Sequence, residues 1–218
     1  MTRKTKNKIN KLIKILFILI FLLIVTFFIL REKKDYDQEI KDMRVVAEIQ
    51  NILNTDLTIY EENIPEETNE SITRLEVSSK DLLISNINYI GVIEIPNLGV
   101  KKPIVQGVTR KDIATKVGWE PHTPMPGHGG NVVLAAHNAS NYFGRIFNLS
   151  NGNLIIVTTK EGVFTYKVFD KFKVHKSEIW VYNELEQYDE TITLITCYYP
   201  DNNYRWIVRG ELIKKEDL

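Results

Sequence analysis

The N-terminal part of the chain joins a short basic segment to a long apolar one. Residues 1–14 carry six Lys or Arg side chains and no acidic one, and residues 15–30 form a run of 16 residues without a charge. Leu12 and Ile13 extend the run past Lys14, whose long side chain can reach the membrane edge, so the segment approaches the roughly 20 apolar residues that span a bilayer. Basic residues before such a span favour the cytoplasmic side, and no small residues mark a cleavage site. We therefore predict a cytoplasmic tail at residues 1–11, a single retained transmembrane anchor at 12–30, and an extracellular remainder.

Residues 31–85 have the pattern of a stalk between a membrane and a folded domain. Within residues 35–54, apolar side chains recur with a spacing that fits an amphipathic helix, which we interpret as a plain helical spacer. Residues 55–80 are rich in Glu, Asn, Thr and Ser and are typical of a flexible tether. The apolar positions of the predicted helix are Tyr36, Ile40, Met43, Val46 or Ala47, Ile49 and Leu53.

From about residue 86 to residue 218 the pattern changes to short apolar or alternating runs that are separated by Gly, Pro, Asn and Asp. Many short strands with little helix predict an all-β domain, a closed or nearly closed barrel. Pro103 lies inside the second run and makes it an edge or irregular strand. The predicted strands are 89–95, 100–105, 131–136, 154–159, 163–174, 192–197 and 205–209, and short helices or turns are expected at 112–117 and 142–149.

Charge and motif content exclude several classes of function. The chain has no net charge, and beyond residue 14 it has 22 basic groups against 28 acidic ones, so the main body does not suit nucleic acid. No P-loop, GxGxxG or CxxC pattern is present. With four His and one Cys, the sequence disfavours a structural zinc site. We expect no metal or other cofactor.

The candidate chemistry lies at the ends of three predicted strands. Cys197 ends one strand, Arg205 opens the next after a short turn, and His137 follows the strand at 131–136. An antiparallel hairpin would bring the thiol beside the guanidinium, a pairing that favours the thiolate. A lone Cys is more often a small buried hydrophobe. Thiol, imidazole and cation together are the parts of a cysteine acyl-transfer site, in which the cation stabilises the developing oxyanion.

These residues also carry a resemblance to a known family. The segment Thr193-Leu194-Ile195-Thr196-Cys197, followed eight residues later by Arg205, resembles the TLxTC…R signature of the sortases. The likeness covers about residues 86–215 in the family's order, and an N-terminal signal-anchor is also the family arrangement. Three further segments resemble the family: 133–138 resembles the segment with the family's catalytic histidine, 126–131 resembles the loop before it, and 91–98 resembles the family's opening strand and turn.

The resemblance implies an eight-stranded β-barrel cysteine transpeptidase of a Gram-positive cell surface. Such enzymes cleave an LPxTG-like C-terminal sorting signal of a secreted surface protein between Thr and Gly. Cys197 would hold the thioester, His137 would act as general acid and base, and Arg205 would contact the substrate backbone and the oxyanion. Thr196 would help to position the substrate. The acceptor would be an amine of a cell-wall precursor (lipid II) or a pilin lysine.

Several alternatives stay open at this point. Arg209 lies on the same strand face as Arg205, but four residues along a strand is roughly 13 Å, which favours Arg205. Asn138 or Asp201 could orient His137. We interpret the other three histidines, His122, His128 and His175, as solvated surface groups. Some relatives bind calcium near the acidic loop at 177–190, whose carboxylates are Glu178, Glu184, Glu186 and Asp189, but a solvated loop is the simpler interpretation.

The subclass and the type of activity are also open. The chain has no hydrophobic segment at its C-terminal end and a short segment before the Cys strand, which favours a class A, D or E-like sortase. A membrane-anchored barrel that binds surface proteins without chemistry would not need all three of His137, Cys197 and Arg205. A hydrolytic cysteine peptidase on the same fold would share every step as far as the thioester.

Overall fold

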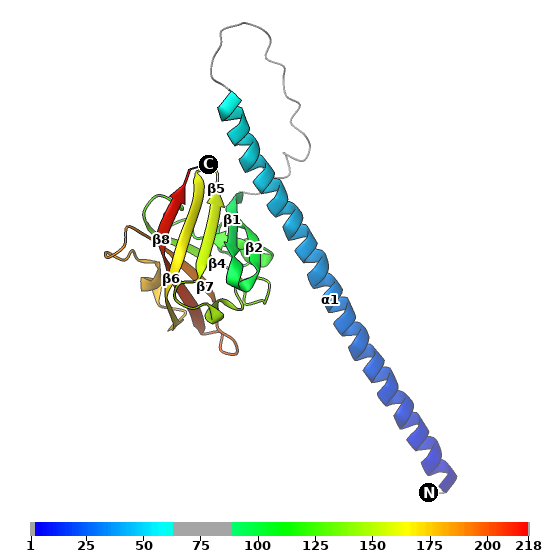
Figure 1. Ribbon diagram of the computed structural model, residues 1–218. Coiled ribbons are helices and arrows are strands. Elements are labelled where there is room, and N and C mark those ends of the chain that lie inside the picture. Colours follow the sequence, from blue (N-terminus) through cyan, green and yellow to red (C-terminus); the bar gives the residue numbers. More distant parts are fainter. Residues whose placement is uncertain (1–2, 63–88, 218) are drawn as a thin grey trace. The chain divides into compact units, whose positions relative to one another are not determined.

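The computed structural model describes residues 3–62 and 89–217 (Figure 1). The chain forms two compact units, residues 1–41 and residues 42–218. The second unit therefore begins inside the predicted stalk. Residues 63–80 of the predicted tether, and the predicted start of the barrel at residue 86, lie outside the described residues.

A single helix, α1 (Arg3–Glu62), includes the apolar run. Within the described chain it is the one helix that is long and apolar enough to cross a membrane, and none of the side chains in its most apolar part is buried. Figure 1 draws α1 without a break from the apolar run into the predicted spacer. The apolar segment that was predicted as a membrane span is therefore part of one continuous helix.

The predicted eight-stranded barrel is confirmed. Its strands close in the order β1-β2-β3-β4-β7-β8-β6-β5, and β4 runs parallel to β7 while β7 and β8 form an antiparallel pair. The strands are β1 (Tyr89–Ile95), β2 (Val100–Gln106), β3 (Val117–Trp119), β4 (Gly130–Ala135), β5 (Leu154–Thr159), β6 (Gly162–His175), β7 (Glu190–Cys197) and β8 (Tyr204–Glu216). Four 3-10 turns complete it: η1 (Pro96–Leu98), η2 (Asp112–Ala114), η3 (Ile146–Asn148) and η4 (Ile179–Tyr182).

The region around β2 and β3 differs from the prediction. The sequence predicts a helix up to Val117, whereas the structure has the short turn η2 and then β3, which pairs in parallel with the end of β2. Of the two alternatives predicted from Pro103, β2 is not an edge strand, because it has a neighbour on both sides, but it is irregular, with a register shift in its pairing with β1. The proline is tolerated because it pairs with Val92 of β1, and the pairing with β3 begins only at Ile104.

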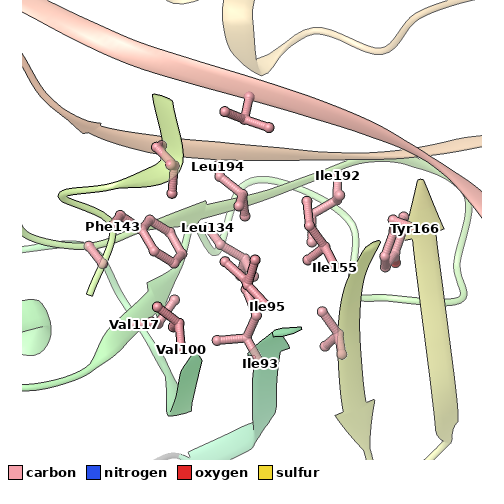
Figure 2. Packing of buried hydrophobic residues seen from close by; sticks show 14 of the residues in the cluster. Ile93, Ile95, Val100, Val117, Leu134, Phe143, Ile155, Tyr166, Ile192 and Leu194 are labelled. Atoms are coloured by element: carbon pink, nitrogen blue, oxygen red, sulfur yellow. The ribbon is translucent and has the colours of Figure 1, made fainter. Parts of the chain in front are cut away.

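Alternating side chains fill the barrel interior. Residues of β1, β4, β5, β6 and β7 meet in one apolar cluster, which Figure 2 shows in close view. Phe143, from the segment after β4, packs in this cluster and is fully buried. The largest buried side chains include Tyr166, Phe143, Phe164, Ile93, Leu134 and Ile192.

The outward faces of β4, β7 and β8 are covered as well. Val133, Ile195 and Ile207 form a second apolar cluster with Val181 of η4. This explains why β7 is buried on both faces except at Cys197. A strand covered on both sides favours the aliphatic and β-branched composition that Ile192–Thr196 shows. The segment between β6 and β7, predicted as a solvated acidic loop, therefore packs on the barrel through η4.

The Pro- and Gly-rich loop before β4 is held by a buried carboxylate. Glu190, the first residue of β7, accepts hydrogen bonds from the backbone N–H groups of Gly127 and Gly129 at 2.8–3.1 Å. The Tyr166 hydroxyl donates to the same carboxylate at 2.5 Å. Both glycines have positive φ, 89° and 77°, which other residues adopt only with strain. Glu190 thus ties the loop to the barrel where the sequence suggested only another acidic loop residue.

Candidate active site

The strand register brings His137 next to Cys197. In the parallel pair of β4 and β7, Ala135 lies opposite Ile195, and the Ala136 N–H continues the ladder by donating to the Ile195 carbonyl at 3.2 Å. His137 and Cys197 each follow two residues after that pair. Since side chains alternate along a strand, Cys197, the last residue of β7, points to the outer face on which Ile195 lies, and His137 lies just past the end of β4.

His137 and Cys197 line the same open cavity. Its volume is about 590 Å³, and its walls also include Asn138, Tyr199 and Asn202. Cys197 is the free thiol, and it and His137 are both half-buried. The thiol and the imidazole are thus accessible together from one side, as a nucleophile and its proton-transfer partner have to be.

Asn138 joins the ends of β4 and β7. Its side-chain N–H donates to the carbonyl of Cys197 at 2.6 Å. The sequence left Asn138 and Asp201 as candidates to orient His137, but the observed partner of Asn138 is the backbone of the cysteine. Asp201 accepts a hydrogen bond from the N–H of Asn203 at 2.9 Å. Asn138 therefore fixes the relative position of the two strand ends at the cavity.

Arg205 stands opposite Cys197 in the antiparallel pair of β7 and β8. Its Nη1 donates to the carbonyls of Asn202 and Tyr204, both at 2.9 Å. Arg205 is half-buried. These bonds tie its guanidinium to the backbone at the start of β8, next to Asn202, which lines the cavity, whereas Arg205 is not among the residues that line it.

Arg209 occupies a different environment, although it lies on the same face of β8. It stands opposite Thr193, only 5% of it is exposed, and its Nη2 donates to the Val181 carbonyl at 3.3 Å. Its guanidinium lies 5.4 and 5.3 Å from the ring centres of Phe172 and Trp180. Burial lowers the pKa of Arg209, an effect that Asp170 opposes. In the described part of the chain, its Nε is the one buried side-chain nitrogen or oxygen without a hydrogen-bond partner.

A polar cluster fixes η4 on the barrel. The Asn131 amide donates to the carbonyls of Val181 and Asn183 at 3.0 and 3.2 Å, and it accepts a 2.7 Å bond from the Thr193 hydroxyl. The two carbonyls flank Tyr182. The pKa of Tyr182 is raised first by burial and then by Glu120, and it is lowered by the nearby charge of Arg205. One sequence signal for this cluster is Asn131, a polar residue at the start of a buried strand.

Thr196 faces away from the cavity. Its side chain is buried, and its hydroxyl donates to the carbonyl of Ala136 at 2.9 Å. The contact ties β7 to the residue directly before His137. The predicted substrate-binding role of Thr196 stays a prediction, and the contact that the structure provides is with the backbone.

The other histidines lie on the surface, as interpreted from the sequence. His122 pairs with Glu120 at 2.7 Å, and His128 lies 3.4 Å from Glu161. His175 is within 2.7 Å of the Ser177 hydroxyl. Within residues 3–62 and 89–217, no group of three or more His, Cys, Asp or Glu side chains is arranged to hold a metal ion.

Comparison with known proteins relates this geometry to one family. The family model described as a sortase domain matches residues 93–213. Sortase D of Bacillus subtilis is 30% identical over 127 residues, which cover 56% of this chain and 63% of the relative. Sortase A of Bacillus anthracis is 32% identical over 128 residues, 57% of this chain and 60% of the relative. The chain thus spans about three fifths of the length of the curated relatives that it matches.

Solved structures extend the comparison. Sortase A of Listeria monocytogenes covers 60% of this chain and 91% of its own, with a TM-score of 0.55 and 26% identity. A sortase D5 transpeptidase of Clostridium perfringens covers 79% of this chain and 98% of its own, with a TM-score of 0.59 and 25% identity. Residues 89–218 are 130 of 218 residues, about 60% of the chain. The second match therefore includes residues upstream of the barrel.

Proposed function

The chain belongs to the sortase family, and we propose that it is a membrane-anchored cysteine transpeptidase. It cleaves an LPxTG-like C-terminal sorting signal of a secreted surface protein between Thr and Gly. It then transfers the protein to an amine of a cell-wall precursor (lipid II) or to a pilin lysine. The anchor at residues 12–30 places the N-terminus in the cytoplasm and the barrel outside the cell.

The proposed reaction proceeds in two acyl transfers. The Cys197 thiolate attacks the Thr carbonyl carbon, and the guanidinium of Arg205 stabilises the negative charge that develops on the carbonyl oxygen. The protonated imidazole of His137 then gives its proton to the Gly nitrogen as the C–N bond breaks, which leaves a thioester. The acceptor amine attacks this thioester, His137 takes up the amine's proton, and Cys197 leaves as the thiolate.

One observation supports this proposal most directly: the shared cavity of His137 and Cys197. Two strands far apart in sequence, β4 and β7, pair in a register that sets both side chains on one face. A binding barrel would not need an accessible thiol and an imidazole together with the cation of Arg205 across the hairpin. We propose that Thr196 supports substrate positioning through the backbone of Ala136.

A transfer assay with the full-length protein in detergent micelles tests the proposal. The protein is incubated with a panel of LPxTG-like peptides, with and without an added amine, and products are identified by mass spectrometry. We expect an acyl adduct on Cys197 and, when amine is present, a peptide–amine product that Cys197→Ala does not form. Cleavage without any amine product, even at high amine concentration, would indicate a hydrolase. Absence of both adduct and cleavage would favour a binding module.

A further inference from the structure

One face of the α1 segment Asp42–Ile49 is buried, although the sequence predicted a plain spacer. The buried residues are Asp42, Val46 and Ile49, whose exposed fractions are 4%, 4% and 6%. They are four and three residues apart, so they lie on one face of the helix. The partner of the two apolar residues is Val92 of β1, with Tyr89 beside it. This segment therefore belongs to the same packed unit as the barrel.

A buried ionic contact fixes this segment. The Asp42 carboxylate accepts a hydrogen bond from Lys102 Nζ at 2.7 Å and lies 2.9 Å from the Tyr142 hydroxyl. Lys102 and Tyr142 are 3% and 6% exposed, and the ammonium lies 4.7 Å from the tyrosine ring centre. A buried charge is tolerated only with such partners. The pKa of Tyr142 is raised by burial and then by the charge of Asp42, which keeps the phenol a neutral donor.

Tyr142 connects this contact to His137. The Tyr142 N–H donates to the Ala139 carbonyl at 2.9 Å. Next to it, the Phe143 N–H donates to the His137 carbonyl at 3.2 Å, and the Ala139 N–H donates to the same carbonyl at 2.9 Å. The segment after β4 therefore folds back on the residue that we propose as the general acid and base. The hydroxyl at its far end has one proton and two acceptors within reach, the Asp42 carboxylate at 2.9 Å and the Thr115 carbonyl at 2.7 Å, which share it.

From this chain of contacts we propose that Asp42 is a positioning residue for His137. The membrane-proximal helix is then part of the catalytic unit and not only a tether. With Asp42 in place, Tyr142 is fixed, and the two backbone bonds to the His137 carbonyl hold the imidazole in the geometry that proton transfer requires. Without it, Lys102 loses its anion, the helix segment separates from β1, and the segment after His137 loosens. The proposal rests on the transpeptidase function for its kinetic consequence.

Kinetics of the full-length protein in micelles test this role. Asp42→Ala is compared with Asp37→Ala, which removes an exposed carboxylate of the same helix. Rates are expressed per Cys197 that reacts with a thiol probe, so unfolded protein does not contribute. We expect Asp42→Ala to lower kcat by about ten- to a hundred-fold with KM within about twofold, and Asp37→Ala to leave both unchanged.

A second substitution separates positioning from a general loss of stability. Tyr142→Phe keeps the buried ring and removes the hydroxyl, so it interrupts the same path at its next step. We expect it to lower kcat as well, and we expect the double variant to be no slower than Asp42→Ala, because both changes break one connection. Additive losses, or a lower melting temperature with normal kcat per reactive thiol, would overturn the proposal.

Hydrogen exchange gives an answer that does not depend on any substrate. The N–H groups of Ala139 and Phe143 should exchange faster in Asp42→Ala than in the wild type or in Asp37→Ala, while the amides of β7 stay protected. Unchanged exchange at residues 139–143 would refute the coupling. If the wild type forms no peptide–amine product, the proposed function fails, and this exchange experiment still decides whether Asp42 positions the segment after His137.

Discussion

At the scale of single residues, alternation along β7 and β8 decides which side chains face outward. Cys197 and Arg205 are spaced by two residues from the outward-facing Ile195 and Ile207, and His137 follows two residues after Ala135. Thr196 and Trp206 are the pair next to Cys197 and Arg205, and they face inward. The polar residue next to the nucleophile therefore bonds to the Ala136 carbonyl and leaves the outer face to the thiol, the imidazole and the guanidinium.

The two arginines of β8 should differ sharply in their effect on catalysis. Arg205→Ala removes the cation opposite Cys197 and should lower kcat/KM by about 10²–10³-fold, the effect typical of losing one oxyanion donor. Arg209→Ala should lower it much less, because Arg209 is buried and its guanidinium packs against the stacked rings of Phe172 and Trp180. Peptide-transfer kinetics on both variants check this. Equal losses would show that the cation at the reaction centre has been assigned wrongly.

At the scale of elements, the segment between β6 and β7 is a packed part of the barrel with an exposed outer surface. Val181 is buried against Val133 and Ile195, while Ile179, Trp180 and Tyr182 are exposed. The carbonyls on either side of Tyr182 accept hydrogen bonds from one amide, that of Asn131. The backbone of η4 is therefore fixed, and we expect its outward side chains to contact the substrate in one arrangement.

Loss of the Asn131 amide should weaken substrate binding without slowing the chemistry. Asn131→Ala leaves the carbonyls around Tyr182 without their donor, so η4 should become mobile and KM should rise about tenfold, equivalent to roughly 1.4 kcal/mol. kcat should stay near the wild-type value, since neither His137 nor Cys197 is touched. Asn153→Ala, which removes an acceptor in the turn before β5, is the matched control. A fall in kcat at constant KM would contradict this role.

The strands that are easiest to predict from the sequence are regular ones in which either one face or both faces are buried. β5 was predicted with its observed bounds, and its burial alternates residue by residue. β3 was missed because three residues, Val117–Trp119, are too few to show a period. The sequence predicts β2 as an edge or irregular strand because of Pro103. It is not an edge strand, but its pairing with β1 is irregular next to the proline, and a sequence does not reveal that the pairing with β3 begins only after it.

Two kinds of sequence signal locate the residues of the candidate site: the ends of predicted strands and a family signature. The sequence places Cys197 and Arg205 across a hairpin, and the observed register agrees. The parallel pairing of β4 with β7, which brings His137 close, joins segments about 60 residues apart and has no local signal. The same holds for Asp42, whose partner Lys102 is 60 residues away and whose spacing fits any amphipathic helix.

At the scale of the whole molecule, the buried tyrosines make the stability of the barrel depend on alkaline pH. Burial raises the pKa of Tyr166 above its usual 10.0, and the charge of Glu190 raises it further. The folded state then keeps a proton that the unfolded chain releases. This stabilisation is complete below about pH 10 and is lost progressively as the pH rises above that value.

Unfolding of the barrel at high pH measures this effect. The unfolding free energy, followed by Trp fluorescence in micelles, should fall as the pH rises above about 10, by up to about 1.4 kcal/mol per pH unit for each such tyrosine. Tyr166→Phe should have a correspondingly shallower alkaline slope, whereas a Phe at the exposed Tyr199 should leave the slope unchanged. Identical slopes for all three proteins would mean that Tyr166 does not control the alkaline limb.

The single cysteine offers a direct test of membrane orientation. Cys197 is the one thiol in the sequence, and it lines an open cavity of about 590 Å³. If α1 crosses the membrane with its basic end inside, a membrane-impermeant maleimide added to intact cells should label the full-length protein. Cys197→Ala should stay unlabelled, which identifies the modified residue.

Asp37→Cys in a Cys197→Ala background adds an exposed thiol on the barrel side of the span and should also be labelled from outside. If both thiols react only after the cells are permeabilised, the barrel lies in the cytoplasm and the proposed access to secreted substrates is lost. If Asp37→Cys reacts in intact cells but Cys197 does not, the orientation holds and the cavity is closed to the reagent.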